Sequence, residues 1–309
     1  MRILVAGGAG FIGTNLVERY LKLNHQVTIV DNMSTGRRNN LKHLEDKFGD
    51  KIKVVTADIT RTLPVFEKNF EVVVNLACPA SPPIYKKLAL ETLRVNSIGV
   101  ENLLATTLRN KARFLQASTS EIYGDPVIHP QPETYKGNVN SYGERSMYDE
   151  GKRFAEALIW SYRKKYNLNT GIIRIFNTYG PYMSPDDGRV VTNFLYQAMN
   201  NKPLTIYGDG TQTRSFCYID DLVRAWIKMT NSNIEGPINI GNPIEFSMLE
   251  LIKTIEKVLN KKCKIVYLPI GKDDPGKRRP DIGLAKRLLN WEPKISLEDG
   301  LRKMGKIKE

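Results

Sequence analysis

The sequence predicts an α/β protein with a doubly wound parallel sheet, and two observations carry this prediction. Short apolar runs without polar alternation recur along the first half of the chain, and stretches with apolar residues at three- and four-residue spacing separate them. Continuous apolar strands are typical of a parallel sheet that is covered on both faces. Strands that alternate with helices give the βαβαβ order of such a sheet.

Each apolar run is an expected strand, and the runs are Ile3–Ala6, Gln26–Val30, Val54–Thr56, Val72–Leu76, Phe114–Ala117 and Ile172–Ile175. Helical spacing is clear in two of the intervening stretches, Ile12–Leu23 and Val95–Leu108. We therefore expect residues 1–177 to form the first lobe.

The pattern changes after about Phe176. Residues 179–188 are rich in Gly and Pro and predict a loop. The elements expected next are a helix (Val191–Met199), a short strand near Ile206, a helix (Met248–Leu259), a strand (Lys264–Leu268) and two short helices. We expect the segments Arg214–Tyr218 and Asp220–Met229 to return to the first lobe. Residues 178–309 are thus predicted to form a smaller, interleaved α/β lobe, with returning elements at about 213–240.

Composition limits the possible functions. At 309 residues and 41% hydrophobic content, the chain suits two lobes that share a cleft. The net charge of +13 is spread over scattered Lys and Arg residues. That pattern indicates a solvated basic surface or attraction of a small polyanion. No basic stripe alternates with aromatic residues, so we expect no nucleic-acid partner.

Cysteine and histidine usage points to a reducing compartment without a metal site. The three cysteines are isolated, without the spacing of a disulfide framework or a metal site: Cys78, Cys217 and Cys263. The three histidines also lack metal-ligand spacing: His25, His43 and His129. The first expected strand starts near Arg2, and no apolar run approaches membrane-spanning length. We therefore expect no leader, no membrane contact and a cytoplasmic location.

A glycine pattern follows the first expected strand and opens the first expected helix: Gly8-x-Gly10-x-x-Gly13. Such glycines allow a tight turn and close approach of a pyrophosphate, although glycine turns also end ordinary strands. Asp31 ends the second strand, where a carboxylate accepts hydrogen bonds from ribose hydroxyls and repels a 2′-phosphate. These residues predict a Rossmann-type dinucleotide site that favours NAD. Arg37 and Arg38 keep NADP open as an alternative.

Tyr148 and Lys152 lie one helical turn apart. A phenol titrates near ~10 and is a poor base at neutral pH, but an ammonium at i+4 on the same helix face favours the phenolate. A cationic nicotinamide nearby acts in the same direction. Lowering the phenol pKa by about three units corresponds to roughly 4 kcal/mol. Together with the glycine pattern, the pair predicts hydride chemistry.

These motifs resemble the extended short-chain dehydrogenase/reductase family over almost the whole chain. The matching stretches are Gly7–Gly13, Asp31-Asn32, Asp58-Ile59, Asn96-x-x-Gly99, Ser118-Thr119-Ser120, Tyr148-x-x-x-Lys152 and Arg174–Asn177. The resemblance implies that Asp58-Ile59 brackets the adenine, that Leu76-Ala77 runs past the ribose, and that Thr119 lies beside Tyr148. The expected cofactor residues are Gly7, Gly10, Phe11, Ile12, Gly13, Asp31, Asn32, Asp58, Ile59, Leu76, Ala77, Tyr148 and Lys152.

Members of this family mostly act on nucleotide-activated sugars, and the second lobe suits such a substrate. Guanidinium groups bind diphosphates and carboxylates in a forked geometry, although a surface Arg is often only solvated. In Gly208–Phe216 a glycine turn precedes Arg214, which resembles the family's pyrophosphate clamp. The expected substrate residues are Pro79, Ser120, Glu121, Asn177, Arg189, Asn193, Tyr207, Arg214 and Arg278.

Narrower features resemble one branch of the family, the UDP-glucuronic acid decarboxylases (UDP-xylose synthases). The stretches concerned are Ala77–Pro83, Ser118–Asp125, Tyr148–Arg153, Asn177–Pro181 and Asp273–Asp281. The chain departs from that pattern at Ser141-Tyr142, where Pro-Ile is common, and at Ile84, where His is common. The resemblance implies decarboxylation of UDP-glucuronate through C4 oxidation, loss of CO₂ and re-reduction. The implied catalytic residues are Thr119, Glu121, Tyr148, Lys152 and Arg278.

Other readings remain open. Glu121 and Arg278 are implied to lie near C5 and C6 of the sugar, but they also suit a salt bridge that closes the cleft. A 4,6-dehydratase or 4-epimerase shares Thr119 and the Tyr148/Lys152 pair, and an oxidative variant releases a UDP-4-keto-pentose and NADH. A non-catalytic NAD-binding scaffold is a further class, although every expected catalytic position is filled. The resemblance also suggests a homodimer packed through helices near Val95–Leu108 and Tyr148–Lys164.

Overall fold

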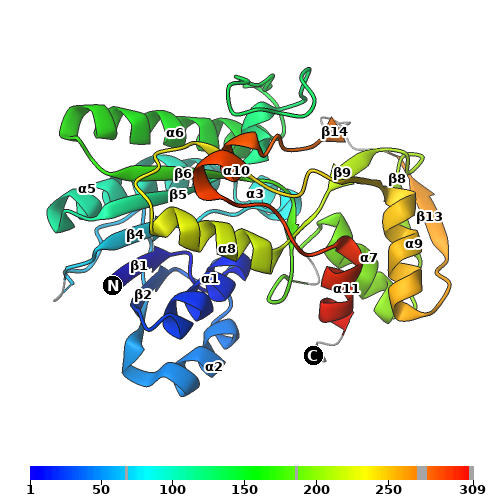
Figure 1. Cartoon of the computed structure of the whole chain (residues 1–309), viewed down its shortest axis with the longest axis horizontal. Helices are drawn as coiled ribbons and strands as arrows, with labels where there is room; N and C mark the ends of the chain where they lie inside the picture. Colours follow the sequence, from blue (N-terminus) through cyan, green and yellow to red (C-terminus); the bar gives the residue numbers. More distant parts are fainter. Residues whose placement is uncertain (67–68, 185–186, 270–276, 306–309) are drawn as a thin grey trace.

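A computed structural model describes residues 1–66, 69–184, 187–269 and 277–305. Its centre is a parallel sheet in the order β11-β6-β5-β4-β1-β2-β3 (Figure 1). The strands of this sheet are β1 (Arg2–Ala6), β2 (Gln26–Asp31), β3 (Ile52–Thr56), β4 (Val72–Asn75), β5 (Arg113–Thr119), β6 (Thr170–Ile175) and β11 (Ile238–Ile240). The sequence predicts all but the last of these strands, and the doubly wound parallel sheet is confirmed.

Side chains of β1 alternate between two hydrophobic clusters, one on each face of the sheet. Ile3 and Val5 belong to the cluster that contains Leu16 of α1 (Phe11–Lys22) and Trp226 of α8 (Ile219–Thr230). Leu4 and Ala6 belong to the cluster under α5 (Val100–Asn110) and α6 (Ser146–Tyr166). Both faces of the strand are therefore dry, which explains its unbroken apolar sequence.

The helix expected over Val95–Leu108 starts as a π-helical turn, η2 (Val95–Gly99), and continues as α5. Helix α2 (Asn39–Phe48) lies near α1, while α3 (Pro82–Lys87) and α4 (Ala89–Arg94) pack against α6. Two 3-10 turns complete this lobe, η1 (Gly49–Lys51) after α2 and η3 (Ser120–Tyr123) directly after β5.

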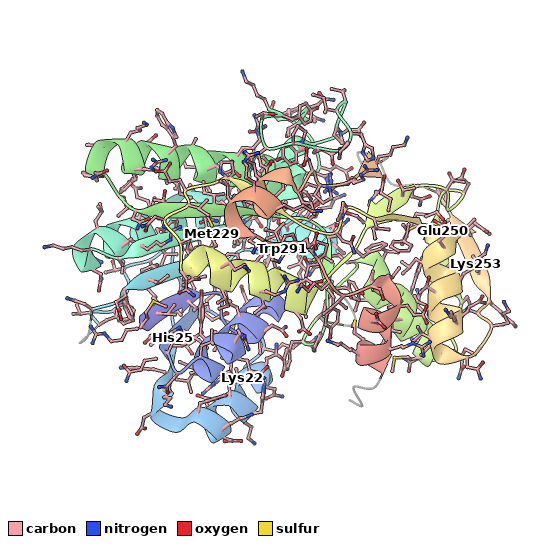
Figure 2. The ribbon with its side chains drawn as sticks, viewed as in Figure 1. Lys22, His25, Met229, Glu250, Lys253 and Trp291 are labelled. Atoms are coloured by element: carbon pink, nitrogen blue, oxygen red, sulfur yellow. The ribbon has the colours of Figure 1, made fainter. Side chains whose placement is uncertain are left out.

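A group of later elements lies to one side of the large sheet (Figure 1). Strands β8 (Leu204–Tyr207) and β13 (Ile265–Leu268) pair in parallel, and α9 (Met248–Leu259) packs against both α7 (Val190–Met199) and α11 (Leu297–Gly305). Helix α9 begins with a capping box, because Ser247 and Glu250 satisfy each other's backbone N–H groups. Glu250 lies in the first turn of this helix (Figure 2). The expected helices and strands of this region are confirmed.

Two later elements return to the first lobe. Helix α8 packs on α1, and β11 joins the large sheet beside β6. Short helix α10 (Gly283–Leu289) also lies against β11 and α8. Trp291 follows this helix (Figure 2), and its indole donates to the Asp221 carbonyl at 2.9 Å.

The prediction that Arg214–Tyr218 forms one returning element is wrong. Strand β9 (Thr213–Ser215) joins a small sheet between β12 (Glu245–Ser247) and β14 (Lys277–Arg278), whereas β10 (Cys217–Tyr218) pairs with β7 (Thr178–Tyr179). The local pattern indicates extended chain but not its partners, because β12 and β14 come much later in the sequence. The lobe boundary at residue 177 and the returning region at about 213–240 stay predictions.

Within the described residues, no helix is both long and apolar enough to cross a membrane. The same residues contain no group of three or more His, Cys, Asp or Glu side chains placed to hold a metal ion.

Candidate active site

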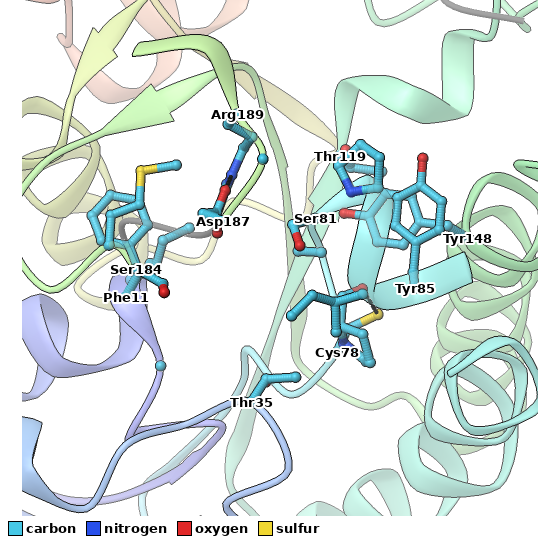
Figure 3. Close-up of a pocket in the computed structure, with 18 of the residues that line it drawn as sticks. Phe11, Thr35, Cys78, Ser81, Tyr85, Thr119, Tyr148, Ser184, Asp187 and Arg189 are labelled. Atoms are coloured by element: carbon cyan, nitrogen blue, oxygen red, sulfur yellow. Dashed lines mark hydrogen bonds and ion pairs between the residues drawn. The ribbon is translucent and has the colours of Figure 1, made fainter. Parts of the chain in front are cut away.

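A cavity of about 1120 Å³ opens at the carboxyl ends of the central strands (Figure 3). Parallel pairing brings these ends to one edge of the sheet, since Ala6 is in register with both Val30 and Asn75. All the residues expected from the sequence to bind cofactor or substrate, or to catalyse, line this one cavity. The structure thus brings them together, while their individual roles stay predictions.

The glycine loop fits a pyrophosphate. Gly7 has a φ of +78°, and a Cβ there would lie 2.6 Å from the Ala77 nitrogen. A Cβ on Gly13 would lie 2.2 Å from the Gly7 carbonyl, so this glycine lets the loop close on α1. By contrast, a Cβ on Gly10 would meet nothing nearer than 3.5 Å, so this position borders open space. Gly10 caps α1 without a side-chain bond, which leaves N–H groups directed toward an anion.

Asp31 is fixed at the end of β2 by the backbone. Its Oδ2 accepts from the Ala9 N–H and its Oδ1 from the Met33 N–H, both at 2.9 Å. Burial raises the pKa of Asp31, while these backbone bonds lower it in part. Each carboxylate oxygen still has a lone pair for a ribose hydroxyl.

The two arginines that kept NADP open differ in position. Arg38 is turned onto Glu45, with two bonds of 2.6 and 2.7 Å between the guanidinium and the carboxylate. Arg37 lines the cavity and donates to the Ser184 hydroxyl at 2.7 Å. Only Arg37 of the pair therefore borders the ribose end of the cavity.

Asp58 and Ile59 line the part of the cavity where the sequence predicts the adenine. The Asn32 amide donates to Asp58 at 3.2 Å, and the Asn102 amide donates to the Ile59 carbonyl at 2.8 Å. Burial raises the pKa of Asp58, but the hydrogen bonds from Thr60 and Asn32 outweigh it and lower the pKa overall. These contacts join β2, the loop after β3 and α5 around one pocket wall.

Tyr148 and Lys152 lie in the first turns of α6, and both side chains are buried. The Lys152 ammonium donates to the Ala117 carbonyl at 3.1 Å and lies 5.8 Å from the centroid of the Tyr148 ring. Burial raises the pKa of Tyr148 above its usual value, Cys78 acts in the same direction, and a hydrogen bond with Thr119 opposes them. The lowered phenol pKa predicted from the sequence is therefore not produced by the protein groups alone.

A column of side chains extends from Tyr148 toward the substrate end. The Tyr85 ring stacks on the Tyr148 ring with centroids 4.9 Å apart and planes 9° apart, and the two lie beside Thr119 (Figure 3). The Arg145 guanidinium lies 5.8 Å from the Tyr85 ring centroid. This arrangement shields the Tyr148 ring from solvent and connects it to a charged cluster.

That cluster is centred on Glu121, in the 3-10 turn after Thr119. One carboxylate oxygen binds Arg278 and the other binds Arg145. Arg278 is 4% exposed, its Nη2 donates to the Gly124 carbonyl at 3.2 Å, and its Nε has no partner. Burial lowers the pKa of Arg278 to about 10, so it stays cationic at neutral pH.

Arg145 and Tyr85 are not singled out by the sequence reasoning, yet both line the cavity. The sequence holds one signal for Arg145, because it stands three residues before Tyr148 and caps the same helix. Tyr85 follows the Pro82-Pro83 pair on a short helix and carries no motif of its own. Of the stretch Asp273–Asp281, residues 273–276 lie outside the described part of the chain.

The remaining expected substrate residues line the second-lobe wall. Arg189 caps α7 and is paired with Asp187 across the cavity from Tyr148 (Figure 3), and Asn193 follows one turn later. Arg214 of β9 is in register with Arg278 of β14. Pro79, Ser120, Asn177 and Tyr207 complete this group.

Comparison with known proteins places this site in a family. The model of the NAD dependent epimerase/dehydratase family matches residues 3–241. The chain belongs to this family. With the glycine loop and Asp31 in place, NAD is its cofactor.

Curated relatives and solved structures narrow the comparison. UDP-glucuronic acid decarboxylase 3 of Arabidopsis thaliana is 47% identical, over 97% of this chain and 87% of the relative. UDP-glucuronic acid decarboxylase 1 of Danio rerio is 45% identical, over 98% of this chain and 71% of the relative. The structure of UDP-glucuronic acid 4-epimerase from Bacillus cereus with UDP-glucuronic acid and NAD aligns with a TM-score of 0.86 at 30% identity, over 98% of this chain and 97% of that one.

Proposed function

We propose that this protein is an NAD-dependent UDP-glucuronate decarboxylase that converts UDP-glucuronate to UDP-xylose and CO₂. The observation that carries the proposal is the Glu121 carboxylate held between Arg145 and Arg278, in the same cavity as Tyr148 and Thr119. Relatives named for this activity at 45–47% identity support it.

The first step is oxidation at C4. Bound NAD⁺ supplies the hydride acceptor for C4 and returns the hydride at the end of the cycle. Tyr148, with Thr119 beside it, takes the proton of the C4 hydroxyl. Because burial raises the pKa of Tyr148, this transfer depends on the positive charges of Lys152 and of the bound cofactor.

The second step is loss of CO₂. Oxidation places a ketone at C4, β to the C6 carboxylate, so the C5–C6 bond breaks with its electron pair moving into an enolate. Tyr148 and Thr119 stabilise the enolate oxygen by hydrogen bonding. The charged cluster then acts at C5 and C6: the guanidinium groups position the departing carboxylate, and a water held by the Glu121 carboxylate delivers a solvent proton to C5. Return of the hydride to C4 and of a proton from Tyr148 to the C4 oxygen gives UDP-xylose.

A 4-epimerase is the second candidate, supported by the solved structure with UDP-glucuronic acid. An epimerase of UDP-glucuronate also needs Tyr148 and Thr119 and also binds the C6 carboxylate, but only decarboxylation requires a proton at C5, where Glu121 and its two guanidinium partners are proposed to act. The buried Arg278–Glu121 pair therefore favours decarboxylation.

Incubation with UDP-glucuronate separates the candidates. We expect one CO₂ per substrate, no net change in absorbance at 340 nm and UDP-xylose as the product by NMR. UDP-galacturonate without CO₂ would identify an epimerase. CO₂ with stoichiometric NADH would identify the oxidative variant that releases a UDP-4-keto-pentose. If UDP-glucuronate stays unchanged while NAD remains bound, the protein would be a non-catalytic scaffold.

We also propose a homodimer, in which a second copy covers the face formed by α4, η2 and α6. These elements pack together, and large apolar side chains on them are exposed to solvent: Leu90, Leu93, Ile98, Phe154 and Trp160. Burying such a patch between two copies is favourable. Light scattering should give twice the chain mass of 35.1 kDa, and Trp160→Glu should give monomers. A monomeric unmodified protein would contradict the proposal.

A cytoplasmic location is proposed on the cysteine pattern. All three cysteines are free: Cys78, Cys217 and Cys263. Free thiols are typical of a reducing compartment. Fractionation of source cells checks the proposal, and recovery of the protein outside the cytoplasm would contradict it.

A further inference from the structure

Arg278 sits on a two-residue strand whose sheet pairing is with β9 alone. Immediately after it, residues 279–281 run along a loop residue of the first lobe, Gln131, with which Pro280 forms an isolated parallel bridge. Gln131 is fully buried, does not line the cavity and lies in the loop between η3 and α6. The segment that delivers Arg278 is therefore attached directly to the first lobe.

Gln131 makes three hydrogen bonds to this segment. Its N–H donates to the Arg279 carbonyl at 2.9 Å, and its carbonyl accepts from the Asp281 N–H at 3.0 Å. Its side-chain Oε1 accepts from the Arg279 N–H at 2.9 Å. The side-chain Nε2 donates back to the Ile128 carbonyl at 2.8 Å, which fixes the amide in one orientation.

A second buried amide anchors this contact to the large sheet. Asn239 lies in β11, and its Nδ2 donates to the Gln131 carbonyl at 3.0 Å and to the Asp281 carbonyl at 3.3 Å. Its Oδ1 accepts from the Tyr123 hydroxyl at 2.8 Å. Gln131, Asn239 and Tyr123 are all buried and hydrogen-bonded, which is the condition under which a polar network confers rigidity.

Rigidity at this point matters because of where Arg278 acts. Its guanidinium is 4% exposed and has to meet the Glu121 carboxylate without the freedom of a surface side chain. Misplacement of a reacting or orienting group by about 1 Å can lower a rate on the order of 100-fold. Arg279 directly follows Arg278 in the chain. Its backbone N–H is held by a side chain of the first lobe, that of Gln131.

We propose that Gln131 is a positioning residue for Arg278. Its side-chain amide fixes the backbone directly after Arg278 and thereby sets the guanidinium at the C5–C6 end of the substrate. Gln131 acts through Arg278 and touches neither substrate nor cofactor. The proposal rests on the decarboxylase function proposed above.

The test compares two partial reactions of the NAD-bound enzyme with UDP-glucuronate: single-turnover NADH formation and ¹⁴CO₂ release. Gln131→Met keeps the length of the side chain and removes its hydrogen bonds. We expect CO₂ release to fall about tenfold or more while NADH formation stays within about twofold, so that NADH accumulates. Gln131→Glu keeps an acceptor for the Arg279 N–H but loses the donor to the Ile128 carbonyl, so it should restore the CO₂ rate only in part.

Gln197→Met is the matched control. The Gln197 side chain also accepts a backbone N–H, from Thr205 at 3.2 Å, but it lies away from Arg278 and does not line the cavity. This variant should leave the ratio of CO₂ to NADH unchanged. If Gln131→Met does not fold, Asn239→Ser removes the amide that holds the Gln131 and Asp281 carbonyls, and the same change in the ratio is expected.

Two results would overturn the positioning role. In the first, a folded Gln131→Met enzyme releases CO₂ and forms NADH at unmodified rates. In the second, both rates fall in parallel, as they do when only the folded fraction changes. If the unmodified protein releases no CO₂ from UDP-glucuronate, the decarboxylase function fails instead, whatever the variants do.

Discussion

The cofactor half and the decarboxylation half of the cavity are built in different ways. The cofactor half uses backbone groups and residues at successive strand ends, such as the glycine loop after β1 and Asp31 at the end of β2. The decarboxylation half joins Glu121 to Arg145, 24 residues away, and to Arg278, 157 residues away. One half is therefore local in sequence and the other depends on tertiary folding.

This difference predicts different consequences of substitution. Losing a group from the cofactor half weakens binding of one ligand, because the backbone around it stays in place. Losing one member of the charged cluster leaves the others buried without a full set of partners, which is costly and alters one chemical step. Tyr148 lies where the halves meet and should affect both.

Tyr148→Phe should have the largest effect. The substitution keeps the stacking on Tyr85 but removes the oxygen that takes the C4 proton. NADH formation and CO₂ release should both fall on the order of 10³-fold, while UDP affinity persists. Tyr162→Phe is the control. Tyr162 lies on the same helix as Tyr148, and its hydroxyl donates to Glu101 of α5 at an exposed contact, so both rates should stay near normal. Near-normal CO₂ release from Tyr148→Phe would refute the mechanism.

Arg278→Met should separate the two halves. Oxidation at C4 and NAD affinity should persist, while ¹⁴CO₂ release falls on the order of 100-fold. Glu121→Gln should impair the same steps around C5, since both Arg278 and Arg145 then lose their charged partner. Single-turnover NADH formation and UDP affinity are the companion measurements. Normal CO₂ release from Arg278→Met would return the chain to the wider dehydratase/epimerase class.

Asp31→Ala should change cofactor choice. The Asp31 carboxylate repels a 2′-phosphate, so its loss should narrow the preference for NAD over NADP by about tenfold or more. Arg37 borders the cavity and can then contact that phosphate, whereas Arg38 is held by Glu45. Dissociation constants of NAD and NADP for the unmodified protein and for Asp31→Ala measure this change in preference. Equal NAD and NADP affinities in the unmodified protein would contradict the role of Asp31.

The sequence signals for the cofactor half are local, and the structure brings the residues that carry them into one cavity. Glycine spacing, strand-end Asp31 and the Tyr148/Lys152 spacing each reflect a constraint within one or two elements. The contact between Arg145 and Glu121 could not be predicted in this way. Only the folded chain brings the guanidinium groups of Arg145 and Arg278 together on Glu121. The strands that pair with β9, namely β12 and β14, could not be predicted either, because they lie far from β9 in the sequence.

The raised pKa of Tyr148 is a second property that the sequence could not predict. Sequence spacing shows that Lys152 lies on the same helix face, and the structure agrees. It does not show how deeply the phenol is buried, and burial is the larger influence on its pKa.

Substitution of Asp149 should have the smallest effect, and that effect should be on the stability of the fold rather than on one step of the reaction. The side chain is 8% exposed, its Oδ1 has no partner, and its Oδ2 lies 3.7 Å from the Arg145 Nε. Burial raises its pKa to about 6, although Arg145 opposes the shift. A carboxyl group whose pKa is higher in the folded state stabilises the fold below its unfolded pKa, near ~3.9, and that contribution is lost as the pH rises through about 6.

Asp149→Asn should therefore stabilise the protein at pH 7.5, by at most about 3 kcal/mol for a shift of two pKa units, and by progressively less toward pH 5. Thermal melting of both proteins from pH 5 to 8 measures the difference, with the exposed Asp50→Asn as a control that should show none. CO₂ release should fall less than about tenfold, because Arg145 keeps Glu121 as its partner. A lower melting temperature for Asp149→Asn at pH 7.5 would mean that Arg145 holds Asp149 ionised. Asp149 would then be a stabilising fourth member of the charged cluster, and the contrast between the two halves of the cavity would be sharper still.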